Sequence, residues 1–199
     1  MNRLERDMFY RGFRKKLESV LQPEEAERIW RNAGDEYACM LSDDPLLKQE
    51  NGAMVIPAVA LYRTLAANGL DAERLLSEYG RDMGIKFAGI VRALTGIPGV
   101  AKLIWKMAGK LADSMSSEEK GYKRRLVSDP PVMYGVDILS CPYHELAKQL
   151  GEERAVMCIC CMDKEYSQGF RKICYDRNSA LPEGAQCCEY RLRFDEDKK

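Results

Sequence analysis

The hydrophobic pattern of this chain changes its period near Pro131, and that change limits the fold more than any other feature. Before this point, apolar side chains recur every three or four residues, as on one face of a helix. After it, apolar and polar side chains alternate, as along a strand, most clearly in residues 186–194. The sequence therefore predicts an α+β fold, with a helical N-terminal half and a C-terminal antiparallel sheet accompanied by a crossing helix.

Cap and breaker residues divide the helical half. Pro23 and Pro57 are typical first residues of helices, and Gly34 is predicted to end the first of the two. Asp71 is a predicted N-cap. The helical stretch 83–111 contains the sequence Gly-Ile-Pro-Gly, which should break it into two helices.

The second half is expected to mix strands with short helices. Residues 114–125 are polar and are predicted to form a connecting loop. The expected elements that follow are a strand ending near Cys141, a helix over 142–150, a strand over 156–161, one or two helical turns over 163–169, and strands over 170–179 and 186–194. We expect a helical region, 1–125, and a cysteine-rich α+β region, 126–199, within one integrated domain.

Charge and hydropathy exclude several classes of partner. Lys plus Arg and Asp plus Glu both number 31, so the net charge is zero and a generic nucleic-acid binder is not expected. No stretch of about 18 residues is free of charge, so no integral membrane segment is expected. The first ten residues lack the apolar core of a secretory signal, which makes a cytoplasmic location the expectation. A homo-oligomer is compatible with the sequence.

Nearly all the cysteine lies in the second half. The chain has 8 cysteines, of which 7 fall between Cys141 and Cys188. In a secreted miniprotein such density would indicate disulfides. In a reducing compartment it indicates free thiols, a metal site or catalysis.

Cys141 and His144 form the first candidate pair. Pro142 suits the first position of a helix, which makes Cys141 the expected N-cap, where the positive helix end favours a thiolate. His144 is the single histidine and follows within the same helical turn. The pair suits a nucleophile with its base or two metal ligands. The alternative is a buried thiol beside a surface imidazole.

The run 158–163 is the second candidate. As a strand, it would place Cys158 and Cys160 on one face and Cys161 on the other, with Asp163 just past the strand end. Free cysteines are often buried, so we interpret Cys158 and Cys161 as core residues.

In the last strand the alternation places Cys188 on the inward apolar face and leaves Cys187 peripheral. The isolated residues Cys39 and Cys174 are interpreted as structural. The double motif of a structural zinc site, one Cys-x-x-Cys followed by a second Cys-x-x-Cys, does not occur. A set of Cys141, Cys160 and Cys188, completed by Asp163 or His144, is still a chemically sensible zinc site.

The C-terminal third resembles the L-2-amino-thiazoline-4-carboxylic acid hydrolase family over about residues 133–194. The motifs that carry the resemblance are CPYHELA at 141–147, LG at 150–151, Cys160-x-x-Asp163, Gly184, and CEYR at 188–191. The family's cysteine after the first strand corresponds to Cys141, its Cys and Asp pair to Cys160 and Asp163, and its final-strand cysteine to Cys188. A more distant similarity is to four-vinyl reductase-type small-molecule-binding domains, some of which hold zinc. The Glu and Cys of those zinc sites are replaced here by Asn178 and Ala180.

The resemblance implies hydrolysis of a small cyclic amidine, such as 2-amino-thiazoline-4-carboxylate, to a carbamoyl-cysteine. Water or a thiolate would attack the carbon between the ring nitrogen and sulfur, and an acid would protonate the leaving atom. The implied catalytic residues are Cys141, His144, Cys160, Asp163 and Cys188, with a small-molecule substrate as partner and no cofactor. The alternative is a non-catalytic module that binds a small molecule or zinc.

Overall fold

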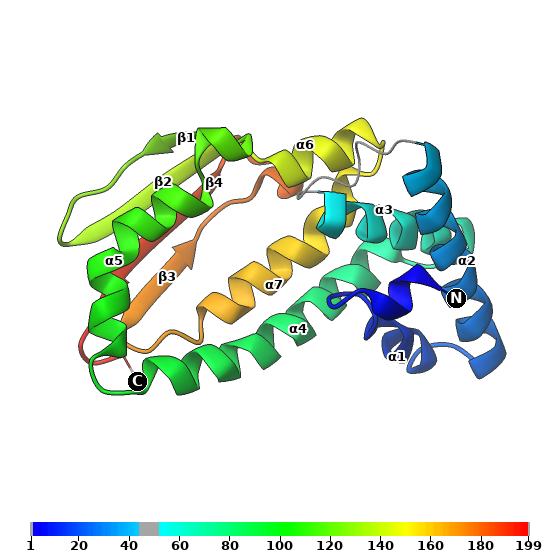
Figure 1. Cartoon of the computed structure of the whole chain (residues 1–199), viewed down its shortest axis with the longest axis horizontal. Helices are drawn as coiled ribbons and strands as arrows, with labels where there is room; N and C mark the ends of the chain where they lie inside the picture. The colour runs from blue at the N-terminus through cyan, green and yellow to red at the C-terminus, as the bar shows by residue number, and fades with distance from the viewer. Residues whose placement is uncertain (1, 44–51, 199) are drawn as a thin grey trace. The chain divides into compact units, whose positions relative to one another are not determined.

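The computed structural model describes residues 2–43 and 52–198 and confirms an α+β architecture (Figure 1). The helices lie mostly in the N-terminal half, and the strands lie in the C-terminal half. The α-helices are α1 (Phe13–Glu18), α2 (Pro23–Asp43), α3 (Gly52–Ala67), α4 (Ala72–Thr95), α5 (Val100–Met115), α6 (Pro142–Gln149) and α7 (Met157–Ser167). The strands are β1 (Lys123–Leu126), β2 (Met133–Ser140), β3 (Ile173–Arg177) and β4 (Cys188–Phe194).

The chain forms two compact units that are not continuous in sequence. Unit 1 contains the chain up to Gly80 together with Glu145–Ile159, and unit 2 contains Arg81–His144 together with the chain from Cys160 onward. The regions 1–125 and 126–199 describe the order of elements along the chain, and as domains they stay a prediction.

Unit 1 is built around the buried faces of α1, α2 and α3, with Phe13, Trp30 and Leu61 among its fully buried side chains. Two predicted boundaries in this unit are wrong. Gly34 does not end α2, because a Cβ there would lie 2.1 Å from Oδ1 of Asn2, so this glycine permits a close approach instead. Pro57 lies inside α3, which begins at Gly52; Val55 and Ile56 are fully buried, so packing extends the helix upstream of the proline.

The start of α4 and the break before α5 follow the sequence signals. Asp71 caps α4, since its Oδ1 accepts a hydrogen bond from the backbone N–H of Arg74 at 3.0 Å. The break at residues 96–99 ends with Gly99 in a left-handed conformation, φ 86°. In the described ranges, no single helix is long and apolar enough to cross a membrane; α4 and α5 meet that criterion only as a pair bent by 113°.

Unit 2 contains a four-stranded antiparallel sheet of order β1-β2-β4-β3. The predicted loop over 114–125 is wrong at both ends: α5 extends to Met115, and Lys123–Leu126 pairs with β2 as an edge strand. This strand gives no alternating apolar signal because its side chains are largely exposed, as is usual for a charged sheet edge. The other three strands lie where the sequence predicts them. β3 and β4 are shorter than the predicted ranges 170–179 and 186–194.

The two faces of the sheet have different surroundings. On the inner face, Val136, Ile138 and Cys188 form a buried cluster. Trp105 of α5 packs against Tyr134 of β2, with ring centroids 5.0 Å apart, so α5 covers one end of this face. On the outer face, the carboxylate of Asp137 pairs with the arginines of neighbouring strands.

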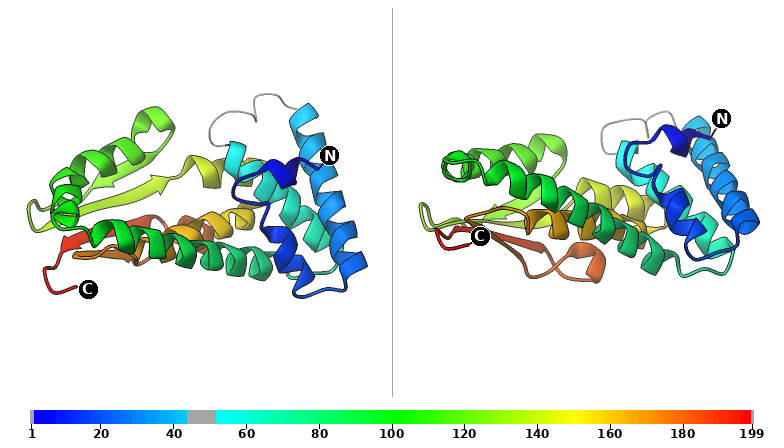
Figure 2. Two further views of the ribbon diagram at one scale, coloured as in Figure 1. Left: turned by 60° about the horizontal axis from the view of Figure 1, so that its bottom comes forward. Right: turned by 90° about the horizontal axis from the view of Figure 1, so that it is seen from below.

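The predicted strand over 156–161 is a helix. A 3-10 turn, η4 (Glu153–Val156), leads directly into α7. A short apolar run does not by itself distinguish a buried strand from a buried helix. The second half of α7 runs beside α4 (Figures 1 and 2), where a Cβ at Gly84 would lie 2.5 Å from the carbonyl oxygen of Met162. Gly84 therefore lets α4 and α7 pack closely against each other as two helices.

Candidate functional site

Cys141 lies between β2 and α6, as the sequence predicts. β2 ends at Ser140, and α6 begins at Pro142, whose fixed φ suits the first helical position. The side chain of Cys141 is half-buried and packs against the inner-face cluster that includes Cys188. The start of α6 therefore holds this thiol at the inner face of the sheet.

Cys188 is the first residue of β4 and pairs with Ile138 of β2. Its side chain is buried, as predicted, and its Sγ accepts a hydrogen bond from the backbone N–H of Leu181 at 3.2 Å. Burial raises the pKa of the Cys188 thiol, and this hydrogen bond only partly offsets the effect. Cys187, its neighbour, is half-buried and outside the inner-face cluster.

Cys160 and Asp163 share one face of α7 because helical residues three apart lie one above the other. In a strand, the same spacing would have pointed them to opposite faces. Burial raises the pKa of the Cys160 thiol well above its usual value, and the charges of Cys141, Cys188 and Asp163 raise it further. Cys141 also packs against the cluster that contains Cys188, and together these observations indicate that the three thiols and the carboxylate lie near one another in unit 2.

Asp163 is held by hydroxyl groups of the inner sheet face. The hydroxyl of Tyr175 donates to its Oδ2 at 2.8 Å, and Nη1 of Arg177 lies 3.7 Å from the same oxygen. Burial raises the pKa of the Asp163 carboxyl, while the hydrogen bond from Tyr175 and the charge of Arg177 lower it without cancelling the rise. The carboxyl thus retains a proton at a higher pH than an ordinary aspartate.

Several residues of this neighbourhood were missed by the sequence analysis, namely Tyr122, Tyr175, Arg177 and Tyr190. For Tyr175 and Arg177 a signal was present in β3, where residues 173, 175 and 177 are buried and alternate with half-buried residues. That alternation places Arg177 inward, opposite Tyr190. An arginine at an inward position of a strand is unusual, because arginine is rarely fully buried unless it is paired.

His144 lies in the first turn of α6, as predicted. Its Nδ1 atom is buried and has no hydrogen-bond partner among the residues that the structure describes. The described contacts do not join the imidazole to Asp163 or Cys160. Its role as a base therefore stays a prediction.

The spacing of the three thiols is wider than that of a preformed metal site. Within residues 2–43 and 52–198, the group whose ligand atoms all lie within 4.8 Å of one another is Asp137, Cys187 and Glu189. Both carboxylate oxygens of Asp137 accept hydrogen bonds from arginines, one from Arg125 and one from Arg191, each at 2.7 Å. This group is therefore an ion-paired cluster, and zinc at the predicted cysteines stays an untested alternative.

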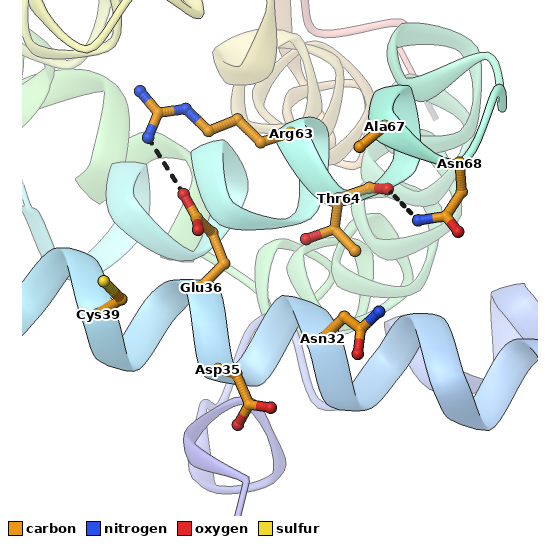
Figure 3. Close-up of a pocket in the computed structure, with 8 residues that line it drawn as sticks. All are labelled: Asn32, Asp35, Glu36, Cys39, Arg63, Thr64, Ala67 and Asn68. Carbon is orange, nitrogen blue, oxygen red and sulfur yellow. Dashed lines mark hydrogen bonds and ion pairs between the residues drawn. The ribbon is translucent and has the colours of Figure 1, made fainter.

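Unit 1 contains a groove of about 640 Å³ between α2 and α3 (Figure 3). Arg63 points toward α2 and pairs with Glu36 at 3.1 Å, and the exposed Cys39 lies one turn further along α2. None of the residues that the sequence predicts for the site lines this groove. An open groove with one exposed thiol lacks the convergence of groups seen in unit 2, so we place the candidate site in unit 2.

Comparisons with solved structures give only loose similarities. An H-NOX protein from Shewanella oneidensis in an Fe(II)NO state is 10% identical, covers 92% of this chain and 98% of its own, and has a TM-score of 0.35. An unliganded Fe(II) H-NOX variant from K. algicida is 10% identical over 95% and 96%, with a TM-score of 0.37. A trafficking protein particle complex subunit 3 from Naegleria fowleri, covalently bound to palmitic acid, is 14% identical over 72% and 98%, with a TM-score of 0.34. These TM-scores are too low to carry a conclusion about this chain.

No curated protein matches the sequence significantly. The comparison with protein families is decisive by contrast, because the match spans most of the chain and includes every element of the candidate site. Residues 48–192 match the L-2-amino-thiazoline-4-carboxylic acid hydrolase family, and the chain belongs to that family.

Proposed function

We propose that this chain is a hydrolase that opens a small cyclic amidine, such as 2-amino-thiazoline-4-carboxylate, to a carbamoyl-cysteine. Its family membership supports this reaction. The observation that carries the proposal is the convergence of Cys141, Cys160 and Cys188 with the carboxyl of Asp163 at the inner face of the sheet. These groups include a nucleophile and an acid, which are the two that ring opening requires.

Cys141 is the proposed nucleophile. Burial raises the pKa of both Cys160 and Cys188, which keeps these two groups as neutral thiols near neutral pH. Cys141 differs from them because it precedes α6, where the positive helix end favours a thiolate. The unpartnered Nδ1 of His144 is the proposed acceptor of its proton.

The proposed reaction has two steps. Sγ of Cys141 attacks the carbon between the ring nitrogen and sulfur, the carbon–sulfur ring bond breaks, and Asp163 gives its proton to the departing sulfur. Water then attacks the same carbon of the enzyme-bound intermediate and gives one proton to Asp163. The bond to Cys141 breaks, and the thiolate regains its proton from His144. The sum is the addition of one water to the substrate. The raised pKa of Asp163 suits the role of acid.

The test is turnover of 2-amino-thiazoline-4-carboxylate, measured as carbamoyl-cysteine by mass spectrometry. We expect Cys141→Ser to lower kcat/KM by about 1000-fold or more, as loss of a nucleophile usually does. Cys187→Ser is the matched control and should leave the rate unchanged, because Cys187 lies outside the inner-face cluster. Equal rates for wild type and Cys141→Ser would remove Cys141 from the mechanism. No turnover of this or any related cyclic amidine would contradict the proposed reaction.

The alternative is a non-catalytic module that binds zinc or a small molecule. The density of thiols around Cys160 favours it, since thiolates are preferred zinc ligands. Metal analysis of protein purified without a histidine tag separates the two proposals. One zinc per chain, lost together with stability in Cys160→Ser, would favour the module. A stable metal-free protein would count against zinc.

A further inference from the structure

Arg177 is a buried charge with one donor atom that makes no hydrogen bond within the part of the chain that the structure describes. It ends β3, and its side chain is only 3% exposed. Its Nη1 atom is buried and, among the described residues, has no hydrogen-bond partner. A guanidinium has five N–H donors and keeps its charge at any pH at which proteins fold. The inner face of the sheet therefore holds a permanent cation whose Nη1 donor is unpaired among the described residues.

Asp163, the acidic residue that pairs with Arg177, does not form a hydrogen bond with Nη1. Oδ2 of Asp163 is 3.7 Å from Nη1, beyond hydrogen-bond distance, and it already accepts from Tyr175 at 2.8 Å. Burial also disfavours the charged form of Asp163, as its raised pKa indicates. Asp163 is thus an ion-pair neighbour of Arg177 but leaves Nη1 without a hydrogen bond, and a carboxylate from outside would supply the missing acceptor.

We propose that Arg177 binds the carboxylate of a small-molecule ligand and thereby anchors that ligand at the inner face of the sheet. A carboxylate is planar and offers two oxygens, so it matches two N–H groups of a guanidinium at once. The inference rests on the proposed function for the identity of the ligand, a small cyclic amidine with a carboxylate, and adds which residue holds that carboxylate.

The neighbours of Arg177 place such an anion beside the proposed chemistry. Tyr190 lies directly opposite Arg177 on β4, and Tyr175 lies two residues before it on the same face. The charge of Arg177 acts on Cys160, whose pKa it lowers against the larger effect of burial. A five-membered ring held through its carboxylate at Arg177 would lie against the thiols of the cluster. Anchoring the remote end of a substrate is how binding energy orients the reacting carbon.

The outer face of the same sheet offers a matched control. Arg193 of β4 pairs with the carboxylate of Asp176 at 2.5 Å, and its side chain is 57% exposed. It has an acceptor in the folded protein and lies in solvent. Arg193→Gln removes one positive charge from the sheet, as Arg177→Gln does, without touching the proposed site.

The probe is thiazolidine-4-carboxylate, whose saturated ring has no amidine carbon and so cannot be opened by the proposed reaction. Its neutral counterpart is thiazolidine-4-carboxamide. With wild-type protein in calorimetric titrations, we expect the carboxylate to bind about 10- to 100-fold more tightly than the carboxamide, the range for a hydrogen-bonded charge. Arg177→Gln and Arg177→Met should reduce this ratio to about one, and Arg193→Gln should keep it.

Equal binding of carboxylate and carboxamide by the wild type would overturn the proposal, as would no measurable binding of either. A ratio that survives in Arg177→Met would assign the anion to another residue. Two variants protect the test against misfolding, and both are accepted only with a wild-type circular dichroism spectrum. Failure here is distinguishable from failure of the proposed reaction. Carboxylate binding through Arg177 without turnover of 2-amino-thiazoline-4-carboxylate would retain the anion site and remove the hydrolase, whereas turnover without carboxylate preference would do the reverse.

Discussion

The two faces of the sheet in unit 2 use the same residue types in opposite ways. On the outer face, Asp137 is buried and accepts from Arg125 and Arg191, each at 2.7 Å, so its charge is fully compensated. On the inner face, Arg177 is buried and lies 3.7 Å from Asp163, with a donor left unpaired. The first arrangement stabilises the fold. The second leaves polar groups unsatisfied, as sites for ligands and catalysis commonly do.

The pKa directions of the two aspartates express the same difference. Burial alone would raise the pKa of Asp137, but the hydrogen bonds from its two arginines outweigh burial and lower it. At Asp163 the effect of burial exceeds that of the hydrogen bonds and of the Arg177 charge, so the pKa is raised. Asp137 therefore stays charged as part of an ion-paired cluster, whereas Asp163 holds its proton to a higher pH than an ordinary aspartate, as an acid in a reaction must.

The largest expected difference between the faces is in stability. Asp137→Ala leaves two arginines without their acceptor and should lower the free energy of unfolding by about 2–4 kcal/mol. Arg177→Met replaces an unsatisfied cation by an apolar side chain of similar length and should leave stability unchanged or raise it by about 1–2 kcal/mol. Equilibrium urea unfolding followed by circular dichroism measures both changes.

Arg193→Gln serves as the baseline for that comparison, because its exposed pair with Asp176 should contribute less than about 1 kcal/mol. If Arg177→Met destabilises as much as Asp137→Ala, the two faces are alike and Arg177 is a structural residue.

The next largest difference concerns thiol reactivity. Burial raises the pKa of Cys188 and Cys160, so both should react with iodoacetamide at least about 10-fold more slowly than the exposed Cys39. Cys187, adjacent to Cys188 but outside the cluster, should react faster than its neighbour. Mass spectrometry of peptides after timed labelling at pH 8 resolves the rates, and labelling in urea gives the unfolded reference. Equal native rates for Cys187 and Cys188 would show that the inner face does not protect its thiols.

The smallest difference is in pH dependence, and its sign separates the two carboxyls. The folded-state pKa of Asp137 is lowered from 3.8, so its contribution to stability is present above that value and is lost as pH falls. The folded-state pKa of Asp163 is raised from 3.8, so its contribution is present below that value and is lost as pH rises through the folded pKa.

Thermal unfolding of wild type, Asp137→Asn and Asp163→Asn between pH 3 and pH 7 tests these signs. The stability of wild type relative to Asp137→Asn should increase with pH, and relative to Asp163→Asn it should decrease. Parallel curves would mean that the two carboxyls have the same environment.

Much of the fold was predictable because local signals and packing agree. The cap at Asp71, the break at residues 96–99 and the inward position of Cys188 follow from side-chain chemistry and period. The wrong predictions occur where the same local pattern is compatible with two different structures. The apolar run 156–161 suits a strand or a helix, and the glycine at position 34 suits a helix end or a close contact.

The candidate site was predictable in its residue types but not in its arrangement. Cys141, Cys160, Asp163 and Cys188 were identified from motifs, yet the wrong element was assigned to Cys160. Only a helix allows Cys160 and Asp163 to share a face. The alternation in β3 places Arg177 inward, but it does not reveal whether a charged side chain has a partner, and so this residue was missed.

The fold class, the cap at Asp71, the break at residues 96–99, the direction of the last strand's side chains and the family all follow from residue type and spacing along the chain. Folding brings Cys141, Cys160 and Cys188 near one another, raises the pKa of Cys160 and Asp163 by burial, and leaves Nη1 of Arg177 without a hydrogen-bond partner among the described residues. These properties depend on which groups are removed from water together. Burial and hydrogen-bond satisfaction are sums over neighbours that are distant in sequence, so they exist only once the chain is folded.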